Sequence, residues 1–143
     1  MDTQIDQFLL KNAKKFIRDS GMSSHVPPDV YDEWKRHPLP ICYALRDSAS
    51  GIVYSFALLR RIHRDVYGRS SRPYVIDFVF THPSYQRNRC ASRLIEHIRN
   101  KDGTVYVFVN TEEHPTVCMM LQKLGFKNAR TPDDQQAFLY DNE

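Results

Sequence analysis

The sequence has little of what marks several protein classes. Its three cysteines, Cys42, Cys90 and Cys118, are an odd number and lack the paired spacing of a disulfide framework or a zinc site. Residues 1–10 carry acids and glutamines where a secretory signal has a basic segment and an apolar run. No apolar run approaches the ~20 residues that cross a bilayer. We therefore expect an intracellular protein, cytoplasmic or nuclear, with reduced thiols, no bound metal and no membrane contact.

A strong excess of one charge is also missing. Lysine and arginine number 20 against 17 aspartates and glutamates, so the formal net charge is only +3. The densest positive run lies in residues 60–72 and contains Arg60, Arg61, His63, Arg64, Arg69 and Arg72. Three interpretations of this run stay open: a solvated loop, attraction of a polyanionic ligand, or contact with nucleic acid. Nucleic acid is the least favoured, because only Tyr67 supplies the aromatic interleaving typical of single-strand binding.

What is present fits one globular domain. The 143 residues are 41% hydrophobic and 26% charged, which suits a folded chain with one core. No repeat, low-complexity segment or long linker divides the sequence. We predict a single domain over residues 1–143.

The N-terminal part predicts helices and then a hairpin. Apolar residues at helical spacing predict an amphipathic helix over residues 3–20, which Gly21 ends. A short helix is expected over residues 29–35. Two runs rich in β-forming residues, 41–46 and 52–59, flank a turn-forming segment and predict a hairpin.

The C-terminal part predicts strand, helix, strand and helix. Residues 74–80 are almost continuously apolar, as in a central strand buried on both faces. A helix follows, with Cys90, Ala91, Leu94, Ile95 and Ile98 facing inward. Residues 105–109 form a second apolar strand, which the intervening helix should make parallel to the first. A last helix begins at Pro115 and ends at Gly125, and a closing strand is predicted over residues 136–140.

The segment with the clearest chemistry is residues 76–94, where a buried strand runs through a short loop directly into a helix. The first N–H groups of a helix have no partners within it and point outward at the positive end of the helix dipole. A strand that delivers such a helix end to the edge of a sheet creates a site for phosphate groups.

This segment resembles the acetyl-CoA motif of the GNAT N-acetyltransferase superfamily, in which a strand leads to x-P-x-Y and then to Q/R-x-x-G-x-G/A at a helix start. The matching residues here are Pro83, Tyr85, Gln86, Arg87, Asn88, Arg89, Cys90 and Ala91. Residues 114–126 resemble the family's second block, and end in Lys123, Leu124, Gly125 and Phe126. The resemblance implies an α/β fold: a mixed, twisted sheet flanked by helices, with two splayed parallel strands at its centre. The family's usual first strand is not evident ahead of Thr3.

The resemblance also implies acetyl-CoA as acetyl donor. Val79, Phe80 and Thr81 would hold its acetyl and pantetheine end. Backbone N–H groups for its pyrophosphate would come from Arg87, Asn88, Arg89, Cys90, Ala91 and Ser92, with arginine side chains adding charge-assisted contacts. His114 stands where the family has an asparagine at the start of the last helix, and is interpreted here chiefly as a helix cap.

Two further departures concern the chemistry. Arg89 occupies a glycine position of the loop, so its side chain either obstructs the phosphate site or adds a charge contact to it. Leu121 replaces the tyrosine that often protonates the departing thiolate. The candidates for a replacement acid are Tyr85, Tyr106, Cys118 and His114, and the sequence does not choose among them.

Asp77 is the candidate general base, because the family often activates the amine through a carboxylate on the strand before the loop. A carboxylate inside an apolar strand needs a polar partner or a cleft, since burying it alone is costly. Two interpretations stay open: a base with a raised pKa, or an aspartate that is paired with an arginine or exposed at a face of the sheet.

The sequence thus predicts an acetyl-CoA-dependent N-acetyltransferase that moves an acetyl group to a primary amine by direct attack. The acceptor is a protein or a small molecule, and neither it nor the oligomeric state follows from the sequence. The alternative is a catalytically inactive protein of the same fold that binds CoA or a protein partner.

Overall fold

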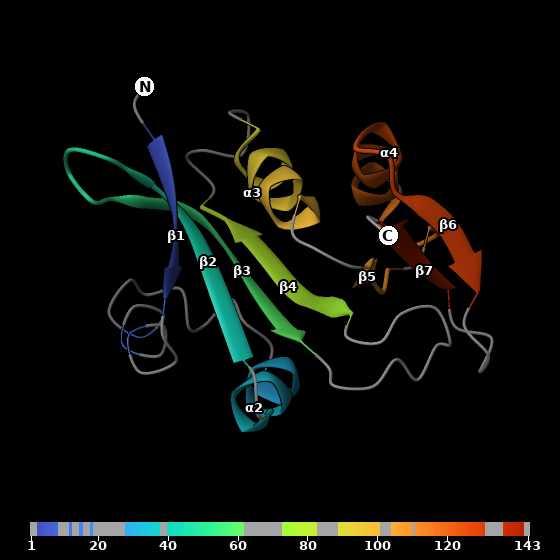
Figure 1. Cartoon of the computed structure of the whole chain (residues 1–143), viewed down its shortest axis with the longest axis horizontal. Helices are drawn as coiled ribbons and strands as arrows, with labels where there is room; N and C mark the ends of the chain where they lie inside the picture. The colour runs from blue at the N-terminus through green and yellow to red at the C-terminus, as the bar shows by residue number, and fades with distance from the viewer. Residues whose placement is uncertain are drawn as a thin grey trace.

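The computed structural model describes residues 3–8, 12, 15, 18, 28–37, 40–61, 73–82, 89–100, 104–109, 111–130 and 136–141. In chain order, the elements of the first half are β1 (Thr3–Phe8), α2 (Pro28–Arg36), β2 (Pro40–Asp47), β3 (Val53–Arg61) and β4 (Tyr74–Thr81). Those of the second half are α3 (Cys90–Arg99), β5 (Thr104–Val107), α4 (Pro115–Lys123), β6 (Lys127–Arg130) and β7 (Gln136–Asp141) (Figure 1). No helix in this described part is long and apolar enough to cross a membrane.

The strands form one mixed sheet of seven, in the order β1-β2-β3-β4-β5-β7-β6. Neighbours pair antiparallel except β4 and β5, which run parallel. The connection between these two strands passes through α3, as the sequence predicts. The predicted fold class, an α/β sheet flanked by helices, is confirmed.

Side chains that alternate along β3 show how the helices cover the sheet. Ala57 and Leu59 lie in the main core with residues of α3 and α4, whereas Phe56 and Leu58 lie in a second cluster with Trp34 of α2. Since successive strand residues point to opposite faces, α2 packs on the other side of the sheet from α3 and α4. The Trp34 indole N–H contacts the carbonyl oxygens of Ile41 and Leu59, both at 3.0 Å, and so ties α2 to the β2–β3 hairpin.

The N-terminal prediction is wrong over its first residues. Residues 3–8 form β1, which pairs antiparallel along β2, and only Asn12, Lys15 and Arg18 of the predicted helix are described as helical. The edge of β2 offers a row of backbone partners, and pairing with it outweighs the helical spacing of the apolar side chains. The strand that the sequence lacked ahead of Thr3 is therefore β1 itself.

The other predicted elements are confirmed with small shifts of their ends: α2, the β2–β3 hairpin, β4, α3, β5, α4 and β7. Of the described strands, β6, a short edge strand, lies where the sequence predicts no element. Three of its residues, Lys127, Asn128 and Arg130, are exposed, so it has no apolar alternation to detect.

The end of α4 follows from one glycine. Gly125 has φ 91°, and its N–H bonds to the Gln122 carbonyl while the Phe126 N–H bonds to the Leu121 carbonyl, both at 3.0 Å. A Cβ on Gly125 would lie 3.1 Å from the ring of Tyr140. This turn brings Phe126 into the main core and starts β6.

Candidate functional site

The site begins where the two parallel strands separate. The pairing of β4 with β5 covers Tyr74–Val105, Val75–Tyr106 and Ile76–Val107 and ends there, while β4 continues to Thr81. Beyond Ile76, β4 keeps its pairing with β3 on the other side, from Phe78 opposite Leu58 to Thr81 opposite Ser55. The predicted splay of the central strands is thereby confirmed.

A cavity of about 330 Å³ lies at this separation. Four elements line it: β4, α3, the end of β5 and the residues after it, and the start of α4. The lining residues are Ile76, Asp77, Phe78, Val79, Ala91, Ile95, Val107, Phe108, Val109, His114, Val117 and Met120. Most are apolar, and among these described residues only Asp77 and His114 carry a titratable group.

A β-bulge gives Asp77 its place. In the pairing of β3 with β4, Leu58 lies opposite Phe78 and the next residue, Leu59, lies opposite Ile76, so Asp77 is the extra residue. A bulge bends its strand and redirects the side chain there. It explains how an aspartate can sit inside an otherwise apolar strand.

Asp77 is held by an arginine of the neighbouring strand. The Arg60 Nε donates to Asp77 Oδ2 at 2.7 Å, and Nη2 donates to Oδ1 at 2.9 Å. The two side chains are 18% and 13% exposed, respectively. Burial raises the pKa of Asp77 above its ordinary value, and the Arg60 hydrogen bonds and charge offset part of that rise. Asp77 therefore lines the cavity and is also paired with Arg60.

The residue at the start of α3 has a backbone conformation that favours glycine, although it is an arginine. Arg89, at the N-cap, has φ 56° and ψ 28°, in the left-handed region. Its carbonyl accepts the first helical hydrogen bond, from the Arg93 N–H at 3.0 Å. An L-residue pays for this conformation with backbone strain that glycine avoids. Residues 83–88, which include Tyr85, Arg87 and Asn88, lie outside the described residues, as do residues 62–72 of the basic run.

A second hollow of about 600 Å³ runs between α3 and α4. Arg89, Ser92, Arg93 and Glu96 line it from α3, and Thr116, Met119, Met120, Lys123 and Leu124 line it from α4 and its end. Three of these side chains are cationic and one is anionic. Met120 borders both hollows, so the apolar cavity and this α3–α4 groove adjoin.

The predicted cofactor residues divide into three groups. Val79, Ala91 and His114 line the cavity, and Arg89 and Ser92 line the α3–α4 groove. The remaining described ones, Phe80, Thr81 and Cys90, line neither hollow, and Arg87 and Asn88 lie outside the described residues.

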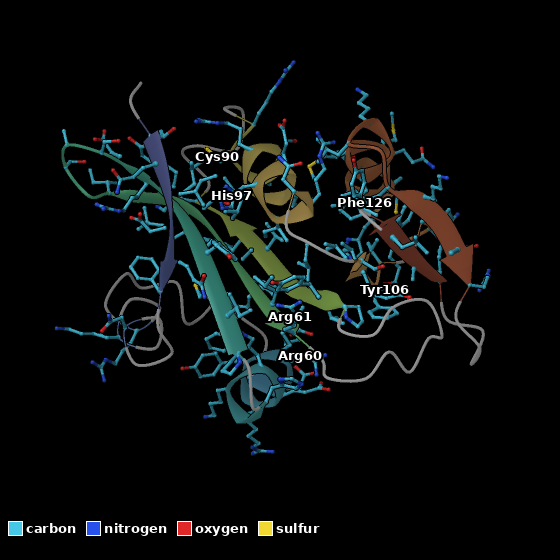
Figure 2. The ribbon with its side chains drawn as sticks, in the orientation of Figure 1. Arg60, Arg61, Cys90, His97, Tyr106 and Phe126 are labelled. Carbon is cyan, nitrogen blue, oxygen red and sulfur yellow. The ribbon has the colours of Figure 1, made fainter. Side chains whose placement is uncertain are left out.

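Each of these three has partners away from both hollows. The ring of Phe80 lies 5.7 Å from that of Phe56, and the Thr81 hydroxyl is 3.0 Å from that of Ser55. Cys90 is fully buried near the start of α3 (Figure 2), where burial raises the pKa of its thiol.

The candidates for a proton donor differ in whether they line the cavity. Cys118 is buried in the main core, and Tyr106 is 1% exposed in a separate cluster on the sheet. Tyr85 lies outside the described residues. His114 lines the cavity and is the N-cap residue of α4, as the sequence predicts. It caps through its backbone carbonyl, which accepts from the Cys118 N–H at 3.1 Å, and its imidazole makes no capping hydrogen bond. Of the described candidates, His114 alone lines the cavity.

Sequence reasoning missed Arg60 as the partner of Asp77 and missed Val117 and Met120 as lining residues. Arg60 and Asp77 are 17 positions apart, and only the register of β3 on β4 brings them together. The helical spacing of Val117 and Met120 with His114 was the one available signal for the α4 wall.

No protein-family model matches the chain, and the search of curated proteins finds no match. Solved structures do match over nearly its whole length. NAA60 of Arabidopsis thaliana in complex with acetyl-CoA superposes with a TM-score of 0.61 at 12% identity, covering 97% of each chain. The aminoglycoside antibiotic 6′-N-acetyltransferase of Acinetobacter baumannii gives 0.59 at 12% identity, covering 88% of this chain and 91% of its own. The ribosomal-protein-S18-alanine N-acetyltransferase of Escherichia coli gives 0.57 at 15% identity, covering 96% and 91%.

The architecture that these structures share is an acetyltransferase architecture. At such low identity the likeness establishes the fold alone: the chain has the GNAT fold.

Proposed function

We propose that the protein is an acetyl-CoA-dependent N-acetyltransferase that acetylates a primary amine by direct attack on the thioester. The observation that carries this proposal is the cavity of about 330 Å³ that opens where the β4–β5 pairing ends. A GNAT fold supports it, and so do matched structures that carry acetyl-CoA or are named as N-acetyltransferases.

The described residues suit the two ends of acetyl-CoA. The lining of the cavity is largely apolar, with the edge of β4 at Val79 facing the gap left by β5, which fits an extended arm that needs both apolar contact and backbone hydrogen bonds. The adjoining α3–α4 groove presents Arg89, Arg93 and Lys123, which fits phosphate groups. The start of α3, at Arg89, adds the positive end of a helix dipole.

The chemistry rests on few groups. Acetyl-CoA supplies an activated acetyl group as its thioester. Asp77 would take a proton from the attacking amine, and its raised pKa brings it closer to the range in which a carboxylate is an effective general base. His114 is the described lining residue able to deliver a proton to the sulfur side. Positioning in the cavity would contribute most of the remaining rate enhancement.

The acceptor is not specified by the fold. One matched structure is named for an aminoglycoside acceptor and another for an alanine of ribosomal protein S18, and they superpose about equally well. A protein amine and a small-molecule amine are therefore both to be tested.

The experiment compares two tryptophan substitutions on α4. Val117 lines the cavity and is 38% exposed, so Val117→Trp can fill the cavity without disturbing the core. Gln122 is exposed on the same helix and lines neither hollow, so Gln122→Trp is the matched control. Calorimetric titration with acetyl-CoA should give saturable binding for the wild type and Gln122→Trp, and a loss of at least about tenfold in affinity for Val117→Trp.

Turnover is measured separately, by mass spectrometry on a panel of peptide and small-molecule amines. Acetylation that the Val117→Trp substitution abolishes would support the enzyme. Binding without acetylation of any amine would favour a protein that only binds the cofactor. No binding at millimolar acetyl-CoA would contradict the proposal as a whole.

A further inference from the structure

Arg60 connects the cavity to the opposite side of the sheet. Its Nε and Nη2 hold the Asp77 carboxylate, while its Nη1 lies 3.5 Å from Glu33 Oε1 on α2. The Glu33 side chain is 71% exposed, so one guanidinium joins a nearly buried carboxylate to a solvated one. Figure 2 shows Arg60 at the end of β3 next to α2.

We propose that Arg60 is a positioning residue for the amine-activating step: it fixes the Asp77 carboxylate at the cavity, and Glu33 weakens its hold from the α2 side. This inference rests on the proposed function, because it assigns Arg60 and Glu33 to the control of the base Asp77. The inference goes beyond the proposed function because it places a residue that influences Asp77, Glu33, on α2 and outside the cavity.

The two-point contact is what makes Arg60 a positioning group. A guanidinium fork that meets both oxygens of a carboxylate fixes its orientation as well as its charge. The bulge gives Asp77 no strand partner in the β3–β4 register, so this pair is the described contact that holds its side chain. Small errors in the placement of a reacting group lower turnover strongly.

Other charged groups surround the pair. A surface hollow of about 500 Å³ beside α2 is lined by Asp29, Asp32, Glu33, Arg36, His37 and Arg60. From α4, His114 lines the cavity that Asp77 also lines. The next residue on β3, Arg61, places its guanidinium 4.9 Å from the ring centre of Tyr74, and so serves as the control cation.

Arg60 and Glu33 act on Asp77 with opposite sign. The Arg60 hydrogen bonds and charge lower the pKa of Asp77, whereas the negative charge of Glu33 raises it. Arg60→Gln should therefore raise the pKa of Asp77 further, and Glu33→Gln should lower it. These opposite shifts test the contact of Arg60 and Glu33 with Asp77. The pH dependence of turnover then separates a positioning role from a purely structural one.

The test is a pH titration of the Asp77 side-chain carboxyl carbon by NMR in the full-length protein, with the resonance assigned by its loss in Asp77→Asn. The expected order of midpoints is Glu33→Gln below wild type and wild type below Arg60→Gln, with Arg61→Gln at the wild-type value. Equal midpoints in wild type and Arg60→Gln, or shifts of the same sign in both variants, would overturn the proposal. If Arg60→Gln does not fold, Arg60→Lys replaces it. Lysine keeps the positive charge but makes a single contact, so the midpoint of Asp77 in Arg60→Lys should lie above the wild-type value.

Activity gives the second readout. In kcat/KM against pH, the acidic limb should move to higher pH in Arg60→Gln and to lower pH in Glu33→Gln, and kcat of Arg60→Lys should fall by up to about 100-fold. The two proposals fail differently. Shifted midpoints without any acetylation would remove the proposed function and leave the contact, whereas acetylation with unmoved midpoints would remove the role of Arg60.

Discussion

The two halves of β4 differ in their strand partners and in their burial. In the first half, residues 74–76, the strand pairs on both sides, and Val75 and Ile76 are 3% and 4% exposed. In the second half, residues 77–81, the pairing with β5 has ended and every residue is half-buried. One strand thus belongs to the core at one end and lines a cavity at the other, and the change falls where its pairing with β5 ends.

The largest effect should come from the second half. Asp77→Asn should lower the rate of acetylation by about 10²- to 10⁴-fold, because the amide cannot accept the proton of the amine. Asp6→Asn, on the far edge strand β1, is the control and should leave the rate unchanged. Steady-state kinetics on the best acceptor of the amine panel measure both, and a loss below threefold for Asp77→Asn would deny Asp77 the role of base.

Two valines compare the halves directly. Val75→Ala should lower the free energy of unfolding by about 2 kcal/mol, because it removes two buried methyl groups and leaves a space in a closed cluster. Val79→Ala, at the half-buried wall of the cavity, should cost less than about 1 kcal/mol.

Urea denaturation measures the stabilities of the two valine variants, and titration with acetyl-CoA measures their affinities. Val79→Ala should weaken binding more than Val75→Ala does, although it costs less stability. A larger loss of stability in Val79→Ala, or a larger loss of affinity in Val75→Ala, would contradict the assignment of Val75 to the core and Val79 to the cavity wall.

Arg89 gives a smaller effect. Arg89→Gly relieves the positive φ but adds freedom to the unfolded chain, so the net gain in the free energy of unfolding should stay below about 1 kcal/mol. Arg89→Ala keeps the strain and should give no such gain. Both should weaken acetyl-CoA binding about two- to fivefold through the lost charge, with the loss fading at high salt. Tighter binding by Arg89→Gly would mean that the arginine obstructs the site.

The smallest effect concerns pH and two carboxylates. Hydrogen bonds from Arg46 and Gln4 lower the pKa of Asp6, so the stability that Asp6 contributes is present above its unfolded pKa and is lost as pH falls through the lowered value. The raised pKa of Asp77 has the opposite consequence: its contribution is greatest at acid pH and declines as pH rises from about 3.8 through the raised value. The free energy of unfolding, measured by denaturation between pH 2 and 6, should fall less toward acid pH in Asp6→Asn than in the wild type. The same pH profile in both proteins would mean that the Asp6–Arg46 pair contributes nothing to stability in water.

The sequence predicts the fold well wherever local pattern and tertiary contacts agree. The strand–helix–strand from β4 to β5 and the glycine turn after α4 are of this kind. It fails at β1, where pairing with β2 overrides helical spacing, and at β6, whose exposed polar residues carry no pattern.

The residues of the site can be predicted only in part from the sequence. The motif located Val79, Ala91, Arg89 and Ser92 at hollows of the structure, because their spacing along a strand and a helix is fixed locally. It could not reveal that Arg60 bonds Asp77, since that contact depends on a bulge and on strand register. Nor could it reveal that Phe80 faces the α2 side with Phe56, which depends on the same bulge.

The central claim is that β4 changes from core to binding wall at Asp77. The most direct measurement is an NMR titration of backbone amides with acetyl-CoA. Saturable shifts of the Asp77, Phe78 and Val79 amides, with much smaller shifts at Val75 and Ile76, are the predicted result. No saturable shift in residues 77–79, or shifts centred on residues 74–76, would contradict it.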